Sequence, residues 1–173
     1  MDKFVKNYNH KIKSSISDLN KSIGKFPRKD SIIMCHGVFD VVHPGHIRHL
    51  IYAKTKAKKL LVTLTADKHI KKGTYRPHVP QDLRAINIAA LEMVDYVLID
   101  NNLTPNNNLK KIKPDFFSKG FEYSSSSLPR ATQEEANIVK SYGGQMIFSP
   151  GDIVFSSSKF LSMHLPKIEN EKL

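Results

Sequence analysis

The sequence predicts an α/β fold: a doubly wound parallel sheet of five strands with flanking helices. From Ser31 onward, a short apolar run, a turn and a segment with helical spacing follow one another several times. That order is typical of parallel β-α-β units. The chain has 173 residues, which suits one compact domain with one core.

The first 30 residues are predicted to form a basic amphipathic helix that extends from the domain. Their apolar side chains recur at spacings of four and three, which places them on one helical face that ends near Gly24. These apolar residues are Phe4, Tyr8, Ile12, Ile16, Leu19 and Ile23. The other face is rich in lysine, so we expect the helix to pack on the domain or on a partner subunit. A nucleic-acid-binding arm is the weaker alternative.

The core domain is expected to span residues 31–165, followed by a polar tail or linker at 166–173. Expected strands cover residues 32–35, 60–65, 96–99, 116–118 and 145–148. Expected helices cover residues 45–59, 81–93, 106–112, 133–142 and 156–163. In such sheets ligands bind at the carboxyl ends of the strands, so the first strand-to-helix turn is the first place to look for a site.

Composition limits the class of protein and its compartment. Cys35 is the one cysteine, so no internal disulfide can form, and a reducing compartment suits the chain. No apolar stretch approaches the roughly 20 residues that span a bilayer, and the N-terminus has no apolar signal region. We therefore expect a cytoplasmic protein without a membrane partner. The net charge of +11 is spread over short clusters and forms no single stripe, which favours a solvated surface or phosphate steering over nucleic-acid binding.

The first turn reads His36-Gly37-Val38-Phe39-Asp40-Val41-Val42-His43-Pro44-Gly45-His46. Pro44 and Gly45 open a helix, so His43 and His46 flank its first turn, where free N–H groups and the helix dipole favour an anion. Gly45 has no side chain, which lets phosphate oxygens approach the backbone. Two other readings of this pair of histidines stay open: half of a zinc site, or two surface histidines.

The run Gly-x-Phe-Asp-x-x-His-x-Gly-His resembles the signature of the cytidylyltransferase-like nucleotidyltransferase superfamily, with its His-x-Gly-His motif. Similarity covers about residues 31–161. Within the superfamily, the chain looks closest to the nucleotidyltransferase domain of heptose-phosphate kinase and adenylyltransferase enzymes, and then to glycerol-3-phosphate cytidylyltransferase. The resemblance implies a Rossmann-like sheet. Further similar stretches are Lys71-Lys72-Gly73, Arg76-Pro77, Val94 to Val97, Thr104-Pro105, Lys113 to Asp115, Lys119 to Tyr123, Tyr142 to Gly144 and Ser156 to Ser158.

The resemblance also implies an activity. The enzyme would transfer a nucleoside monophosphate from CTP or ATP to a sugar phosphate or polyol phosphate and release pyrophosphate. The product would be a nucleotide-activated sugar for surface polysaccharide synthesis. Mg²⁺ is expected to arrive with the triphosphate, without a dedicated protein metal site. A homodimer and a sugar kinase domain or partner are further implied. The alternative from another class is a non-catalytic nucleotide- or nucleic-acid-binding module.

Roles for individual residues follow from the same resemblance. Catalytic roles fall to His43, His46 and Lys72, and contacts with the acceptor phosphate to Lys71 and Arg84. The nucleotide would bind to Val38, Phe39, Gly45, Lys119, Gly120, Gly151, Ser156, Ser157 and Ser158. The chain departs from its close relatives at two places, with His36-Gly37-Val38 in place of Asn-Gly-Cys and three serines in place of Ser-Thr-Thr. These departures bear on the choice of base and acceptor.

Overall fold

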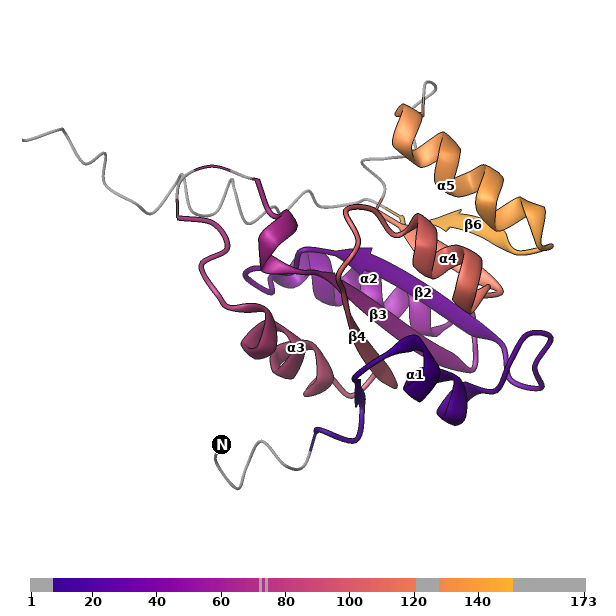
Figure 1. Ribbon diagram of the computed structural model, residues 1–173, viewed down its shortest axis with the longest axis horizontal. Helices are drawn as coiled ribbons and strands as arrows, with labels where there is room; N and C mark the ends of the chain where they lie inside the picture. The colour runs from indigo at the N-terminus through magenta and orange to yellow at the C-terminus, as the bar shows by residue number, and fades with distance from the viewer. Residues whose placement is uncertain (1–7, 72, 74, 121–127, 151–173) are drawn as a thin grey trace, which may run out of the picture.

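One parallel sheet of six strands organises the chain (Figure 1). The computed structural model describes residues 8–71, 73, 75–120 and 128–150. The strand order is β1-β4-β3-β2-β5-β6, and every neighbouring pair is parallel. The strands are β1 (Ile12–Lys13), β2 (Ile32–Gly37), β3 (Lys59–Thr65), β4 (Tyr96–Asp100), β5 (Phe116–Lys119) and β6 (Gln145–Phe148).

Strand β1 corrects the prediction of five strands and of one helix reaching from Phe4 to Gly24. Ile12 pairs with Val97 of β4 and so extends the sheet at its edge. The helix α1 (Ile16–Ile23) begins only after Ser15, whose hydroxyl caps it by accepting a hydrogen bond from the backbone N–H of Asp18 at 3.1 Å. Its predicted end near Gly24 is confirmed, since Gly24 follows the last helical residue with φ +76.

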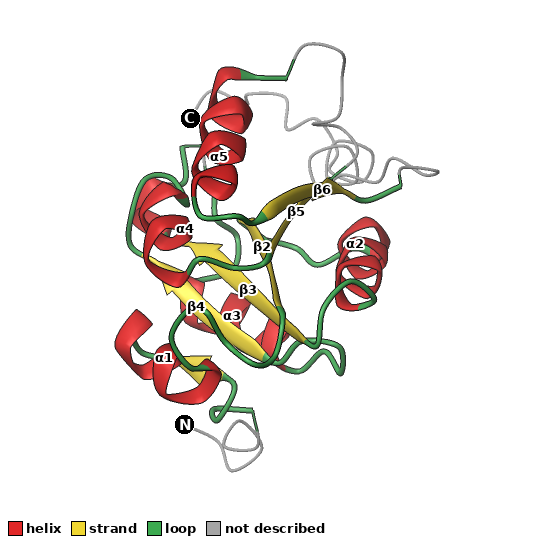
Figure 2. Ribbon diagram, turned by 90° about the vertical axis from the view of Figure 1, so that its right-hand side faces the viewer, coloured by secondary structure: helices red, strands yellow, loops and turns green. Residues whose placement is uncertain are grey.

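Helices cover both faces of the sheet, which confirms the doubly wound architecture (Figure 2). Helices α2 (Pro44–Lys54) and α3 (Gln81–Ala89) bury Leu50 and Ile88 against one face. Helices α1, α4 (Asn106–Ile112) and α5 (Arg130–Ser141) cover the other, where Leu19 of α1 is fully buried. Because both faces are covered, residues 32–35 of β2 are buried without alternation.

The observed helices match four of the predicted ones in place. Helix α4 has the predicted bounds, whereas α2 and α3 end four or five residues earlier than predicted and α5 starts earlier, directly after Pro129. Pro129 occupies the N-cap of α5, a position where its missing N–H costs nothing. The predicted helix at residues 156–163 lies outside the described residues, as does the predicted tail at 166–173.

The strand order reverses direction between β2 and β5. From β2 the chain crosses to β3 and β4 on one side, and β5 and β6 are added on the other side. In parallel sheets such a switch point leaves a crevice at the carboxyl edge, between the loops that follow the two strands. The loop after β2 carries the histidines of the first turn, so the fold places that turn at the crevice.

Candidate active site

The turn between β2 and α2 holds two histidines in contact. His43 is the N-cap of α2, with an extended backbone, and Pro44 follows as the first helical residue. The rings of His43 and His46 are stacked, with centroids 3.7 Å apart and an angle of 26° between their planes. Both imidazoles thus lie at the first turn of α2, where free backbone N–H groups and the positive end of the helix dipole favour an anion.

The ring of Phe39 supports this turn by packing against His46 and Gly37. Phe39 is 5% exposed, adopts a left-handed conformation with φ +50, and its ring lies 4.8 Å from that of His46. The ring fills the space beside Gly37, where a Cβ would come within 2.9 Å of a ring carbon. A side chain at position 37 would therefore displace the ring that supports His46, which explains why the turn needs glycine there.

Asp40 connects the turn to the loop that leads into α3. Its buried carboxylate accepts a hydrogen bond from the backbone N–H of Val79 at 3.0 Å and forms an ion pair with Nε of Arg76 at 2.9 Å. Arg76 is followed by Pro77, and this pair was among the stretches of family similarity. A buried carboxylate with a cation and a backbone N–H around it is a fixed part of the scaffold. Arg76 is thus a residue of the site region to which the sequence alone assigned no role.

Arg84 has a different place from the one predicted. It was predicted to bind the acceptor phosphate, yet its side chain is 0% exposed. Its guanidinium donates to the backbone oxygens of Val38, Thr65 and Val79 and forms an ion pair with Asp67. Because these four acceptors surround it inside the protein, the prediction is corrected: Arg84 holds the loops after β2 and β3 together and does not face a ligand.

Lys119 and Ser149 lie on the other side of the switch point. The Lys119 ammonium pairs with Glu135 of α5 and donates to Thr132 at 3.2 Å, while the backbone oxygen of Lys119 accepts from the N–H of Ser149 at 2.9 Å. The Ser149 hydroxyl lies 3.0 Å from Nδ1 of His49, one turn beyond His46 on α2. The contact between His49 and Ser149 therefore ties the histidine-bearing helix to the end of β6.

A polar row crosses the carboxyl end of the sheet beside this crevice. His36 of β2 has its Nδ1 2.8 Å from the Thr63 hydroxyl and its Nε2 3.3 Å from the Thr65 hydroxyl. The same Nδ1 lies 4.0 Å from Oδ2 of Asp100. Burial, and secondly the charge of Lys119, lower the pKa of His36 to about 4, so the ring is neutral at pH 7. Burial also raises the pKa of Asp100.

His36, whose side chain is 14% exposed, makes folding stability depend on pH. Its pKa falls from 6.5 to about 4 on folding, so the unfolded chain binds more protons between these values. The contribution of His36 to the free energy of unfolding is fully present above about pH 6.5 and is lost as the pH falls toward about 4. In urea unfolding at pH 7 and pH 4.5, we expect the wild type to lose roughly 2 to 3 kcal/mol more than His36→Asn. Equal losses in both proteins would contradict this assignment.

The structure thus brings part of the predicted site together. Val38, Phe39 and His43 lie between β2 and α2, and Gly45 and His46 lie in the first turn of α2. Across the switch point, Lys119 ends β5 and Gly120 follows it. Lys71 is exposed in the loop after β3. The predicted residues Lys72, Gly151, Ser156, Ser157 and Ser158 lie outside the described residues. His49 and Ser149 were missed, although the spacing of three between His46 and His49 marks one helical face.

In the described part of the chain, no three His, Cys, Asp or Glu side chains gather closely enough to hold a metal ion. None of its helices combines the length and the apolar character needed to cross a bilayer. Cys35 is buried, and burial raises the pKa of its thiol, so this thiol is protonated at neutral pH.

A family model described as cytidylyltransferase-like matches residues 34–161, which include the histidine turn, β2 from its third residue onward and the strands β3 to β6. The chain belongs to the cytidylyltransferase-like family. This confirms the family predicted from the first turn.

Relatives of this cytidylyltransferase-like chain agree with the narrower resemblance. It is 33% identical over 141 residues to a D-beta-D-heptose 1-phosphate adenylyltransferase of Bordetella bronchiseptica, covering 80% of this chain and 83% of that protein. It is 38% identical over 122 residues to the bifunctional protein HldE of Campylobacter concisus, covering 69% of this chain and 25% of HldE. The chain therefore spans about a quarter of the length of its HldE relatives.

Solved structures support the fold of the cytidylyltransferase-like chain. A lipopolysaccharide core biosynthesis protein of Thermoplasma volcanium superimposes with a TM-score of 0.59 at 22% identity, covering 70% of this chain and 98% of that one. A pantoate-beta-alanine ligase of Francisella tularensis gives a TM-score of 0.55 at 14% identity, with 83% and 67% of the two chains covered. At these identities the likeness bears on the fold alone.

Proposed function

We propose that this nucleotidyltransferase transfers the adenylyl group of ATP to a heptose 1-phosphate, giving a nucleotide-activated sugar for surface polysaccharide synthesis. The stacked pair His43 and His46 at the start of α2 carries the proposal, because it places two imidazoles where a triphosphate would meet the switch point. The choice of ATP and of heptose rests on the Bordetella relative, which matches this chain over most of both lengths.

The reaction needs positioning and charge compensation more than covalent catalysis. A phosphate oxygen of the acceptor attacks the α-phosphorus, the bond from that phosphorus to the bridging oxygen of the β-phosphate breaks, and pyrophosphate leaves with the electron pair. His43 and His46 would donate hydrogen bonds to phosphate oxygens whose charge grows during this step. Lys71 on the loop after β3 is proposed to complete the phosphate contacts, together with Lys72, Ser156, Ser157 and Ser158.

Magnesium is proposed to enter with the triphosphate. Two carboxylates of the described site region are already engaged, Asp40 by Arg76 and Asp67 by Arg84. These residues therefore do not fit a metal held by the protein itself, and they do fit an ion that the phosphates carry. Mg²⁺ bound in this way would offset negative charge on the leaving pyrophosphate.

Location, partners and domain limits are proposals of the same kind. A cytoplasmic enzyme would have access to ATP and keep Cys35 reduced. The sugar phosphate must come from a kinase-class reaction, which a separate protein or a fused domain can supply. A homodimer is proposed as the assembled form. Residues 31–165 are proposed as the catalytic domain, with residues 8–30 adding β1 and α1 to the same sheet.

Pyrophosphate release tests the proposal directly. The full chain with Mg²⁺ is mixed with ATP or CTP and with heptose 1-phosphate, hexose phosphates or glycerol 3-phosphate. We expect release with ATP and heptose 1-phosphate to exceed that of other pairs. Release with CTP and a polyol phosphate would move the assignment to the cytidylyltransferases. No release with any pair, together with salt-sensitive binding of nucleic acid, would favour the non-catalytic alternative.

A further inference from the structure

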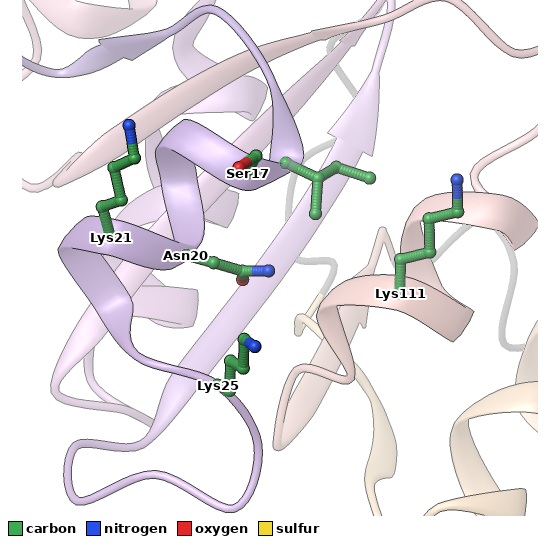
Figure 3. Close-up of a pocket in the computed structure, with 6 residues that line it drawn as sticks. Ser17, Asn20, Lys21, Lys25 and Lys111 are labelled. Carbon is green, nitrogen blue, oxygen red and sulfur yellow. The ribbon is translucent and has the colours of Figure 1, made fainter.

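A basic groove of about 510 Å³ runs between α1 and α4 (Figure 3). We call it the lysine groove; it is lined by Ile16, Ser17, Asn20, Lys21, Lys25 and Lys111. Lys25 stands on the loop after α1, and Lys111 stands across from it on α4, as Figure 3 shows. A smaller hollow of about 200 Å³ shares Asn20, Lys25 and Lys111 and continues the groove toward Phe26 and Lys113.

The lysine groove is lined by positively charged side chains and by no acidic side chain. Neither hollow has an aspartate or glutamate in its lining. Within the described ranges, the ion pairs of the protein leave out Lys21, Lys25 and Lys111 altogether. Like charges gathered around a concave surface focus a positive potential, which a bound anion would offset. The hydroxyl of Ser17 and the amide of Asn20 add hydrogen-bonding groups to the same wall.

The lysine groove is separate from the candidate active site. His43 lies beyond the carboxyl end of β2. Lys111 belongs to the last turn of α4, the helix that brings the chain back to the start of β5, and Lys25 lies just before the chain enters β2. The lysine groove therefore opens near the amino edge of the sheet, at the end opposite the histidines. A ligand there would bridge the N-terminal segment and α4 without touching the catalytic turn.

We propose that the lysine groove binds a small ligand with several phosphate groups. Its volume falls within the range of about 300 to 1,000 Å³ that small-molecule sites occupy. Lys25 and Lys111, which lie across the groove from each other, can each contact a phosphate, and Ser17 and Asn20 can hydrogen-bond phosphate or hydroxyl oxygens. The two hollows have volumes of about 510 and 200 Å³, which suit a small ligand better than the extended basic track along which a nucleic-acid strand binds.

The aromatic side chain beside the groove also argues for a small ligand. Single-stranded nucleic acid binds where bases stack on free aromatic rings between basic residues. The ring of Phe26 already packs edge-on against Tyr142, with centroids 6.2 Å apart, and lies between Arg28 and Lys113 at 5.8 Å each. Phe26 is 39% exposed, so these three neighbours occupy part of its surface and leave only the rest open to a stacked base.

Titration calorimetry with inorganic tripolyphosphate tests this site in the full chain, on a His43→Ala, His46→Ala background that weakens binding at the catalytic turn. In this background, Lys21→Ala, Lys25→Ala and Lys111→Ala together should weaken tripolyphosphate binding at low salt by at least about tenfold. A matched triple variant, Lys56→Ala, Lys58→Ala and Lys140→Ala, removes the same charge from exposed lysines elsewhere. It should weaken binding by less than about threefold.

Two results would overturn the proposal. Equal weakening by the two triple variants would mean that tripolyphosphate responds only to net charge. Binding of single-stranded RNA in the lysine groove more tightly than tripolyphosphate, lost with the groove lysines, would assign it to nucleic acid instead. Circular dichroism checks that both triple variants fold. Because binding is measured with both catalytic histidines replaced, its outcome is independent of whether the proposed adenylyl transfer takes place.

Discussion

His43→Ala and His46→Ala are each expected to lower kcat for pyrophosphate release by about 10² to 10³-fold. Each imidazole is proposed to donate to phosphate oxygens whose negative charge grows in the transition state. Removing such a donor raises the barrier more than it weakens binding of the ground state. Because the two ring centroids lie 3.7 Å apart, both imidazoles are proposed to act on one phosphate region. The double variant should therefore lose less than the product of the two single losses.

Steady-state kinetics at saturating ATP and acceptor measure this effect, and His10→Ala provides the matched control. His10 is an exposed histidine before β1, remote in sequence from the turn. Its replacement should change kcat by less than about twofold, as expected for a surface substitution. Activity of His43→Ala and His46→Ala at the level of His10→Ala would show that the stacked pair has no part in the reaction.

Local patterns explain why the histidine turn could be predicted from the sequence. His43, Pro44, Gly45 and His46 are neighbours along the chain, so the helix start and the positions of both rings follow from the first turn of one helix. The alternation of strands and helices likewise depends on short segments, and it predicted every strand from β2 to β6. The fold class therefore follows from spacing that each segment carries by itself.

The misplaced features depend on contacts between segments far apart in sequence. Ile12 has the spacing of a helical face, and only its pairing with Val97 makes it part of a strand. Arg84 lies in the first turns of a helix near a basic loop, and in the sequence this position resembles a phosphate site. In the structure, the carbonyl groups of Val38 and Thr65 accept its hydrogen bonds instead. Such partners are brought together by the tertiary fold, and the spacing of residues along the chain does not predict them.

The contacts between loops also give the site its support. Asp40 binds the loop before α3 through Arg76 and Val79, and His49 joins α2 to Ser149 after β6. Arg84 connects the loops that follow β2 and β3. These buried polar contacts hold the turn of His43 from three sides. Preorganised donors of this kind lower the barrier because they need not rearrange during the reaction.

Arg84→Met is expected to lower the free energy of unfolding by about 3 to 5 kcal/mol. Methionine keeps much of the side-chain volume but removes every donor. The backbone oxygens of Val38, Thr65 and Val79 would lose their partner, and the carboxylate of Asp67 would lose its ion pair. Buried acceptors left without partners carry their full desolvation cost, so the loss should far exceed that of a surface arginine.

Urea unfolding of Arg84→Met beside Arg130→Met distinguishes a scaffold role from contact with the acceptor. Arg130 has a side chain 93% exposed and pairs with Glu134 one turn along α5, so its replacement should cost less than about 1 kcal/mol. If Arg84 instead bound the acceptor phosphate, Arg84→Met would unfold like the wild type and would show a raised KM for the acceptor alone. The buried position of Arg84 predicts a large loss of stability in Arg84→Met and almost none in Arg130→Met. The reason is that the Arg84 guanidinium holds two loops of the site together, whereas the exposed Arg130 does not.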